Sequence, residues 1–398
     1  MGILRTNTLS GIGTNGPVFD GITRLDTQGY FVPPPGTTDQ RSAGITTTQG
    51  AIRFNTDSQK LEFYAQDQWF EMVIDTPALG TSSDTGAGAR GVFGGGIAVT
   101  PATTRLNVIE YITISSTGNV VDFGDLSVDK AALSACSSST RGVFGGGATP
   151  TPALTYFNTI EYITISSTGN VVDFGDLSVG KNVLSACSSS TRGVFGGGFT
   201  PTPALTYFNT IEYITISSTG NVVDFGDLSV GKSNLSACSS STRGVFGGGV
   251  TPTPALTYFN TIEYITISST GNVVDFGDLS VGKAALSACS SSTRGVFGGG
   301  VTPTPAVTYF NTIEYITISS TGNVVDFGDL SVGKTNLSAC SSSTRGVFGG
   351  GFTPTPALTV FNVIEYITIS STGNVVDFGD LSVGKYNLSA CSNGHGGL

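Results

Sequence analysis

Charge, histidine and long apolar runs are scarce in this sequence. Charged residues make up 12% of its 398 residues, and the formal net charge is −10. Contacts with nucleic acid or with an anionic membrane need a basic surface, so the composition argues against both kinds of partner. The apolar runs are far shorter than the roughly 20 residues that span a bilayer as a helix. We therefore expect neither nucleic-acid binding nor membrane insertion.

Histidine and cysteine offer little to catalysis or metal binding. The one histidine, His395, stands in a terminal NGHGGL segment and has no triad partner or metal-ligand set at a readable spacing. We expect it to be a solvated tail residue. Zinc sites need paired ligands at short spacing, whereas each cysteine here has one place in a long repeat. We expect buried small residues, no metal and no cofactor, at Cys136, Cys187, Cys238, Cys289, Cys340 and Cys391.

Glycine is abundant, and much of it lies in a repeat. There are 56 glycines, and the heptad RGVFGGG begins at six arginines spaced 51 residues apart: Arg90, Arg141, Arg192, Arg243, Arg294 and Arg345. Periods of roughly 20 to 50 residues are typical of solenoids, propellers and arrays, and the upper end is typical of kelch-type blades.

Each repeat is predicted to contain four short strands. In the copy that begins at Arg141 these are RGVFGGG, TIEYITI, NVVDFGDL and LSACSSS, separated by the loop or turn segments ATPTPALTYFN, SSTGN and SVGKNV. Nothing in the unit has helical periodicity. Four antiparallel strands per unit, apolar on both faces, predict blades packed face to face. The expected fold is all-β, a six-bladed β-propeller of 51-residue repeats.

The ends of the repeat region predict that the ring closes. No LSACSSS segment precedes Arg90, whereas the last copy ends in a surplus YNLSACSNGHGGL. We expect this C-terminal strand to complete the first blade, because closure removes sheet edges that invite aggregation. The residues expected to lock the ring are Asn387, Leu388, Ser389, Ala390 and Cys391, with Ser392 at the end of the strand.

The chain before the repeats has a different character. Residues 1–49 are rich in Thr, Gly and Pro, and we expect an extended attachment arm that is ordered by partners. Residues 50–74 hold Trp69, the only tryptophan, and predict a three-stranded β-meander that serves as a connector. Residues 75–89 are expected to form a linker, and residues 90–398 the propeller.

Two segments fit the phosphate-loop pattern, GDLSVGKS from Gly226 and GDLSVGKT from Gly328. Phosphate binding requires a helix directly after such a loop. The segment that follows here, NLSACSSS, predicts a strand instead. The other copies also lack a Ser or Thr after the lysine. We therefore expect no nucleotide site.

Carboxylates recur in every repeat, as Glu161, Asp173 and Asp176 illustrate. Two carboxylates can hydrolyse glycosides, so a propeller glycosidase acting on polysaccharide is one alternative function. An active site breaks the symmetry of a ring, however, whereas these carboxylates occur in every copy. We expect no catalytic residues, and structural bonds at the blade junctions in which Arg141 pairs with Asp or Glu.

The repeats differ mostly on one predicted face, where the loop after the glycines and the loop between blades meet. The lysines Lys130, Lys181, Lys232, Lys283, Lys334 and Lys385 are expected there too. Aromatic residues on loops of a rigid scaffold suit carbohydrate or protein contacts. The candidate ligand- or receptor-binding residues are Tyr156, Tyr207, Tyr258, Tyr309, Phe199, Phe352 and Tyr386. The alternative is that the tyrosines pack each loop against its own blade.

Two resemblances bear on identity. GVFGGG followed by NTIEYITI is similar to a kelch blade over the region from Arg90 onward, although Phe174 and its equivalents stand roughly where kelch blades have tryptophan. The whole chain resembles structural proteins of tailed phages, especially those that infect marine cyanobacteria. The NVVDFGDLSVGK…LSACSSSTRGVFGGG units resemble propeller repeats of such proteins, and GAIRFNTDSQKLEFYAQDQWFEM resembles a connector of phage fibres and adhesins.

The phage resemblance implies a non-enzymatic virion protein, in a tail or neck fibre or on the capsid. It implies that the N-terminal region binds other virion proteins, that the chain is a homo-oligomer, with a trimer favoured, and that the propeller faces outward. The propeller would then recognise a host-surface glycan or protein, or contact other virion subunits. The alternatives are a glycosidase that acts on host polysaccharide and a kelch-type protein–protein scaffold.

Overall fold

The computed structural model describes residues 33–42, 50–58, 60–65, 67–71, 89–100, 102–150, 153–252, 255–303, 306–354 and 357–398. The chain divides into two compact units, Met1–Thr76 and Pro77–Leu398. Most of the expected arm (1–32 and 43–49) and of the expected linker (75–88) lies outside the described residues. Among the described residues, no helix has the length and apolar character needed to cross a membrane.

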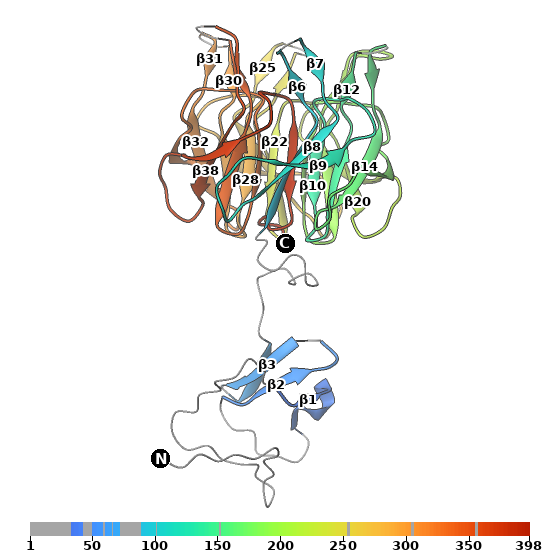
Figure 1. Cartoon of the computed structure of the whole chain (residues 1–398), viewed down its shortest axis with the longest axis vertical. Helices are drawn as coiled ribbons and strands as arrows, with labels where there is room; N and C mark the ends of the chain where they lie inside the picture. Colours follow the sequence, from blue (N-terminus) through green and yellow to red (C-terminus); the bar gives the residue numbers. More distant parts are fainter. Residues whose placement is uncertain are drawn as a thin grey trace, which may run out of the picture. The chain divides into compact units, whose positions relative to one another are not determined.

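The first unit is a small sheet of four strands in the order β1-β2-β3-β4 (Figure 1). Strands β2 (Ile52–Asn55), β3 (Lys60–Ala65) and β4 (Gln68–Glu71) form an antiparallel meander, as the sequence predicts. The expectation of a purely extended segment before residue 50 is wrong for its described part. Strand β1 (Pro35–Gly36) pairs with β2 in parallel, and a 3-10 helix, η1, covers Thr38–Ser42.

Glu62 on β3 organises the first unit. Its side chain is fully buried and accepts hydrogen bonds from Arg41 and, at 2.7 Å, from Asn55 Nδ2. The hydrogen bond from Arg41 is the main reason why the pKa of Glu62 lies below its usual value. Trp69 Nε1 donates to the carbonyl oxygen of Arg41 at 3.2 Å. The 3-10 helix is therefore fixed to the meander through Arg41.

The described part of the second unit contains six four-stranded antiparallel sheets, each assembled from 51-residue repeats. Sheet 1 has the order β40 (Ser389–Ser392), β5 (Arg90–Gly94), β8 (Val108–Thr113), β9 (Val121–Asp125). Sheet 2 is β10 (Ser134–Ser137), β11 (Arg141–Gly145), β14 (Thr159–Thr164), β15 (Val172–Asp176). Sheet 3 is β16 (Ser185–Ser188), β17 (Arg192–Gly196), β20 (Thr210–Thr215), β21 (Val223–Asp227).

The remaining three sheets repeat the same order. Sheet 4 is β22 (Ser236–Ser239), β23 (Arg243–Gly247), β26 (Thr261–Thr266), β27 (Val274–Asp278). Sheet 5 is β28 (Ser287–Ser290), β29 (Arg294–Gly298), β32 (Thr312–Thr317), β33 (Val325–Asp329). Sheet 6 is β34 (Ser338–Ser341), β35 (Arg345–Gly349), β38 (Val363–Thr368), β39 (Val376–Asp380).

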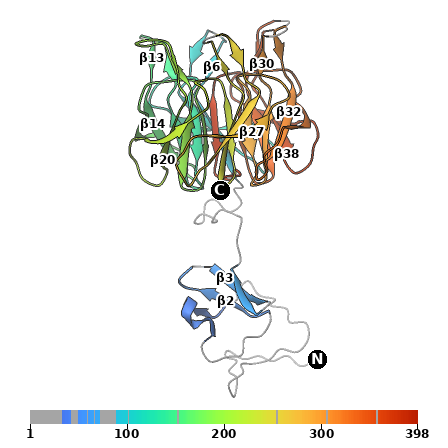
Figure 2. The same ribbon diagram turned by 180° about the vertical axis from the view of Figure 1, so that it is seen from behind.

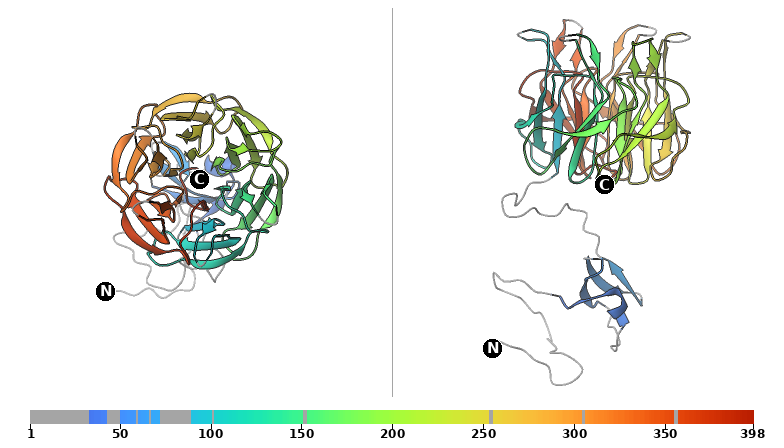
Figure 3. Two further views of the ribbon diagram at one scale, coloured as in Figure 1. Left: turned by 90° about the horizontal axis from the view of Figure 1, so that it is seen from above. Right: turned by 90° about the vertical axis from the view of Figure 1, so that its right-hand side faces the viewer.

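The sheets follow one another around a central axis (Figure 3). The inner strand of each sheet contacts the inner strands of the sheets before and after it, and β40 contacts both β34 and β10. Strand β40 lies antiparallel to β5, with Cys391 opposite Val92 and Ala390 opposite Phe93. The C-terminal segment thus supplies the strand that the first repeat lacks.

The apolar core lies between neighbouring sheets. Val143 and Phe144 of β11 are fully buried, and Phe195 of sheet 3 packs with Val143 in one cluster. A Cβ atom on Gly145 would lie 2.9 Å from the ring of Phe195. Glycine at this place therefore allows the next sheet to pack closely, which is one reason for the repeated RGVFGGG.

The outer edge of each sheet is covered by the following repeat. Gly169 and Val171 donate backbone hydrogen bonds to the carbonyl oxygens of Phe123 and Asp125 at 2.7 and 3.0 Å. Asp125 N in turn donates to Asn170 Oδ1 at 3.0 Å. The same contacts occur at every junction, including the one between sheets 6 and 1. Outer strands that would otherwise be open to pairing are protected in this way.

Candidate functional site

A two-stranded hairpin follows the second strand of every sheet. The hairpins are β6 (Ile97–Ala98) with β7 (Thr104–Arg105), β12 (Ala148–Thr149) with β13 (Thr155–Tyr156), β18 (Phe199–Thr200) with β19 (Thr206–Tyr207), β24 (Val250–Thr251) with β25 (Thr257–Tyr258), β30 (Val301–Thr302) with β31 (Thr308–Tyr309), and β36 (Phe352–Thr353) with β37 (Thr359–Val360). They gather at the end of the sheets away from the C-terminus (Figures 1 and 2). We call this end the hairpin face. The sequence predicts only a loop here, so the hairpins are an addition.

The glycines after each second strand turn the chain into its hairpin. Gly146 and Gly147 have φ values of 72° and 98°, in the region that favours glycine. A Cβ on Gly146 would also lie 2.6 Å from the carbonyl oxygen of Lys181. The loop between sheets reaches the same place, since Asn182 pairs with Phe199 as an isolated bridge. The variable loop of one repeat is therefore in contact with the variable hairpin of the next repeat.

One aromatic cluster on the hairpin face is built around Phe199. Phe199 stands opposite Tyr207 in its hairpin, and the two rings stack with centroids 5.4 Å apart and an interplanar angle of 15°. Tyr156 from the preceding hairpin contacts the same Phe199 edge-on, with the two ring centroids 6.2 Å apart. All three rings are half-buried. Burial raises the pKa of Tyr207.

A second aromatic cluster is built around Phe352. The ring centroid of Tyr386 lies 4.8 Å from that of Phe352, and Tyr309 of the preceding hairpin lies 6.5 Å away. Tyr386 reaches this place from the loop before β40, and it also pairs with Ile97 as an isolated bridge. Tyr258 stands opposite Val250, a residue with no ring to stack on. The structure thus groups six of the seven candidate binding residues into two clusters.

The hairpin tips expose aliphatic side chains. Five equivalent residues are between 58% and 64% exposed: Leu154, Leu205, Leu256, Val307 and Leu358. In the first repeat Thr103 has this place and Arg105 has the place of Tyr156. Exposed apolar patches on a rigid scaffold are typical of interaction sites.

The lysines expected on the variable face are buried, and their side chains are not free for a ligand. Lys181 is fully buried, and its Nζ lies 2.7 Å from Glu212 Oε2. The other carboxylate oxygen of Glu212 accepts a hydrogen bond from Ser178 N at 3.1 Å. Every repeat has this ion pair, with Lys385 paired to Glu110. Each pair fixes the loop between sheets to the third strand of the sheet it enters.

The arginines that begin each repeat also differ from expectation. Arg141 does not pair with a carboxylate in the described structure. Its guanidinium lies 4.5 Å from the ring centroid of Tyr162, and its Nη1 donates to the carbonyl oxygen of Ile216 in the next sheet at 2.9 Å. The junctions are indeed joined by polar contacts, but the acceptor is a backbone carbonyl. The aromatic partner was not visible in the sequence.

The recurrent carboxylates do not form a pair of free acids. Glu161 is buried and held by Lys130 at 2.5 Å and by Ser127 N at 3.2 Å. Asp173 stands opposite Glu161 on the outer strand and is exposed. In the two phosphate-loop matches, Gly226 and Gly328 lie within strands β21 and β33. Strands, not helices, follow these segments, as the sequence predicts.

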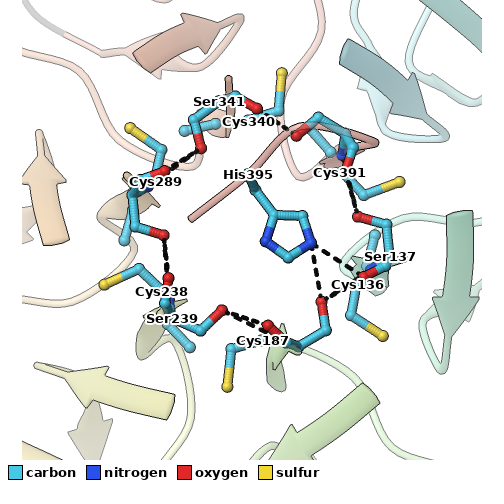
Figure 4. A pocket seen from close by; sticks show the side chains of 18 of the residues that line it. Cys136, Ser137, Cys187, Cys238, Ser239, Cys289, Cys340, Ser341, Cys391 and His395 are labelled. Atoms are coloured by element: carbon cyan, nitrogen blue, oxygen red, sulfur yellow. Dashed lines mark hydrogen bonds between the residues drawn. The ribbon is translucent and has the colours of Figure 1, made fainter. Parts of the chain in front are cut away.

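The cysteines line a central channel together with the serines that follow them (Figure 4). All six cysteines are free and buried, which confirms the sequence interpretation. Burial raises the pKa of Cys187 to about 12. Their sulfur atoms point away from the channel axis (Figure 4). Within the described ranges, no group of His, Cys, Asp and Glu is arranged to hold a metal ion.

The serines form a circle of hydrogen bonds that the sequence does not reveal. Ser188 Oγ donates to the carbonyl oxygen of Ser137 at 2.8 Å and accepts from Ser137 N at 3.1 Å. Each serine hydroxyl around the channel donates in the same way to the preceding repeat, and Ser137 Oγ donates to Ser392 O at 2.7 Å. The repeat period alone does not say which constant polar residues meet.

His395 is not a solvated tail residue. Its ring enters the channel, where Nε2 lies 3.0 Å from Ser137 O and 3.2 Å from Ser188 Oγ (Figure 4). Nδ1 accepts a hydrogen bond from Gly397 N at 3.0 Å, so the neutral ring carries its proton on Nε2. Burial lowers the pKa of His395 to about 4. The tail is therefore part of the channel wall.

The residues expected to lock the ring lie on or beside β40. Leu388, Ser389 and Cys391 are buried, and Ala390 is half-buried. Asn387 N donates to Asn336 O at 3.0 Å, and Ala132 N donates to Asn387 O at 2.8 Å. These bonds belong to a second circle, formed by backbone groups next to the hairpin face. Asn387 thus joins the last repeat to the second sheet.

No known family model matches the sequence, and no curated protein shows significant similarity to it.

Proposed function

We propose that the second unit is a six-bladed kelch-like β-propeller closed by its C-terminal strand. Six sheets with one strand order and inner strands in mutual contact support this assignment. The pairing of β40 with β5 and the two hydrogen-bond circles support closure. A propeller leaves only short, protected edges, which agrees with the covered outer strands.

The propeller acts as a binding module and not as an enzyme. The observation that carries this proposal is the distribution of differences between the repeats. The framework is nearly constant and uses its buried Lys and Glu residues and its half-buried Arg residues for its own contacts. The changes fall on the hairpin face, at the residue after the glycines and at those after the lysine, as Phe199 and Asn182 illustrate. A rigid scaffold that varies at one face is typical of recognition.

The chain serves as a non-enzymatic structural protein of a tailed-phage virion. This part of the proposal rests on the resemblance of the repeats and of Gly50–Met72 to virion proteins. The first unit attaches the chain to other virion proteins, as a homo-oligomer for which a trimer is favoured. The hairpin face then contacts the host surface or other virion subunits.

Electron microscopy of intact particles labelled with antibodies against the full chain tests the virion role. Labelling at one fixed place on the particle is expected, and that place identifies fibre, neck or capsid. Signal confined to free protein in the lysate would contradict a virion role. Release of new reducing ends from polysaccharide by the purified full chain would contradict the non-enzymatic role.

A further inference from the structure

We propose that the hairpin face holds two separate sugar-binding platforms, centred on Phe199 and Phe352, that each stack one pyranose ring of a neutral polysaccharide. The inference rests on the proposed binding role of this face and names its ligand class.

The two phenylalanines have the same place in repeats that are three units apart. In a ring of six repeats this separation puts them on opposite sides of the axis. The four equivalent positions hold Ile97, Ala148, Val250 and Val301, none of which is aromatic. The platforms therefore occur twice, although the hairpin itself occurs six times.

Each platform combines rings that pack against one another and are half-exposed. Phe199 is held between Tyr156 and Tyr207, and Phe352 between Tyr309 and Tyr386. Aromatic faces carry negative charge density, which attracts the weakly positive C–H groups on one face of a pyranose. A rigid tyrosine also offers contact area at low conformational-entropy cost.

The tyrosine hydroxyls supply polar groups for the sugar. Tyr156, Tyr207, Tyr309 and Tyr386 make no side-chain hydrogen bond to any other residue in the described part of the chain. Their rings are packed, while their hydroxyls have no hydrogen-bond partner among the residues that the structure describes. Sugar hydroxyls are both donors and acceptors, as is the tyrosine hydroxyl.

The charge around the platforms favours a neutral ligand. The hairpin sequences FTPTPALTY from Phe199 and FTPTPALTV from Phe352 contain no Asp, Glu, Lys or Arg. The neighbouring lysines, such as Lys181, are buried in ion pairs with glutamate. These two hairpins therefore offer no charged partner to an acidic or a basic polymer, and the charged Arg105 belongs to the first hairpin. A protein partner would need a continuous interface of roughly 800 Å² on each side, whereas the aromatic residues form two separate clusters.

Two platforms on one rigid ring bind a polymer more tightly than either alone. The second contact becomes intramolecular once the first has formed, which raises overall binding by roughly 10²–10⁴-fold. A polysaccharide presents the same sugar face many times and so can occupy both. Single and double removal of the platforms therefore have different expected effects.

The repeats themselves provide matched variants. Phe199→Val and Phe352→Val give these hairpins the residue that repeats four and five have as Val250 and Val301, so folding is expected to persist. Val250→Ala and Val301→Ala are the controls, because alanine has this place in the second repeat as Ala148. The full-length chain is used throughout, and its β-sheet circular dichroism and melting confirm folding.

The probes are four methyl pyranosides (glucoside, galactoside, mannoside and N-acetylglucosaminide) and four neutral polymers (dextran, mannan, galactan and β-glucan). Saturation transfer by NMR from aromatic protons to at least one pyranoside is expected for the natural chain and for the two valine-to-alanine controls. It is expected to be lost in the double phenylalanine variant. On immobilised polymer, each single phenylalanine variant is expected to bind at least tenfold more weakly.

Three results would overturn the inference. These are no transfer to any pyranoside, transfer unchanged in the double variant, or a single variant that already equals the double variant on the polymer. If the chain instead bound host cells or virion proteins through the hairpin face but no pyranoside, the proposed function would stand while the sugar platforms would not.

Discussion

Lys385 and Glu110 form a buried ion pair although 275 residues separate them in the chain. The side chain of Lys385 is 0% exposed and that of Glu110 is 3% exposed. Five other copies of this pair join a loop between sheets to the sheet it enters. This copy joins the end of the repeat region to its beginning, so its removal tests the proposed closure of the ring.

Replacing Lys385 by methionine leaves the carboxylate of Glu110 buried and unpaired. The expected loss of unfolding free energy is about 3–5 kcal/mol, measured by urea denaturation. Lys60→Met is the control, because Lys60 pairs with Glu71 at the surface and its loss is expected to cost far less. The double variant Lys385→Met with Glu110→Leu is expected to recover most of the loss. A double variant as unstable as the single one would contradict the role of the unpaired charge.

The His395 ring makes stability depend on pH. Its pKa is about 4 in the folded chain because the ring is buried, against 6.5 for a free histidine. Between these values the unfolded chain holds a proton that the folded chain lacks, so stability falls as pH drops from 6.5 toward 4. The loss is at most about 3 kcal/mol and is reduced by the exposed part of the ring. Denaturation at pH 7 and pH 4.5 checks this, and the fall should be smaller in His395→Gln.

Val183 has a φ of 46°, which is strained for a β-branched residue. Three of the five equivalent positions with positive φ hold Asn: Asn234, Asn336 and Asn387. Val183→Asn is therefore expected to stabilise the chain by about 1 kcal/mol. Thermal melting measures the gain, and Asn234→Val is the reciprocal variant that should lower the melting temperature. Equal melting temperatures of the natural chain, Val183→Asn and Asn234→Val would show that the backbone strain does not affect stability.

The channel cysteines are expected to be unreactive in the folded chain. Burial raises the pKa of Cys289 and of Cys391 to about 12, and reactivity requires the exposed thiolate. A colorimetric disulfide reagent at pH 8 should label no thiol before denaturation and six afterwards, since the sequence has six cysteines. Fast labelling of the native protein would mean that the inner strands open.

The 51-residue period, together with the order of the four segments within each repeat, predicts the strands and their grouping into sheets. RGVFGGG, TIEYITI, NVVDFGDL and LSACSSS each hold a strand, and the surplus segment at Cys391 pairs with the segment after Arg90. This works because β-branched and aromatic residues alternate with glycine-rich turns in every copy. The burial of the cysteines was predicted from their constant position in the repeat.

Contacts between constant polar residues were not predictable in this way. Every repeat carries the same Lys, Glu and Arg, so the comparison of repeats gives no clue that Lys181 meets Glu212 rather than an aspartate. His395 has no equivalent in any repeat. A short polar segment at the end of a chain predicts a solvated tail, and only the structure shows that this one enters the channel. The hairpin in TPTPALTY was missed because its strands are only two residues long.

The position of β5 within sheet 1 gives the unit a mechanical property. The chain enters the sheet at Arg90, and β5 has β40 on one side and β8 on the other. Tension applied from the N-terminal side therefore loads two hydrogen-bond ladders in parallel, and both resist as shear along the strand. A pull at this end strains the ring at the one sheet whose two sides come from opposite ends of the chain. The pairing of β40 with β5 is therefore expected to limit the force that this sheet withstands.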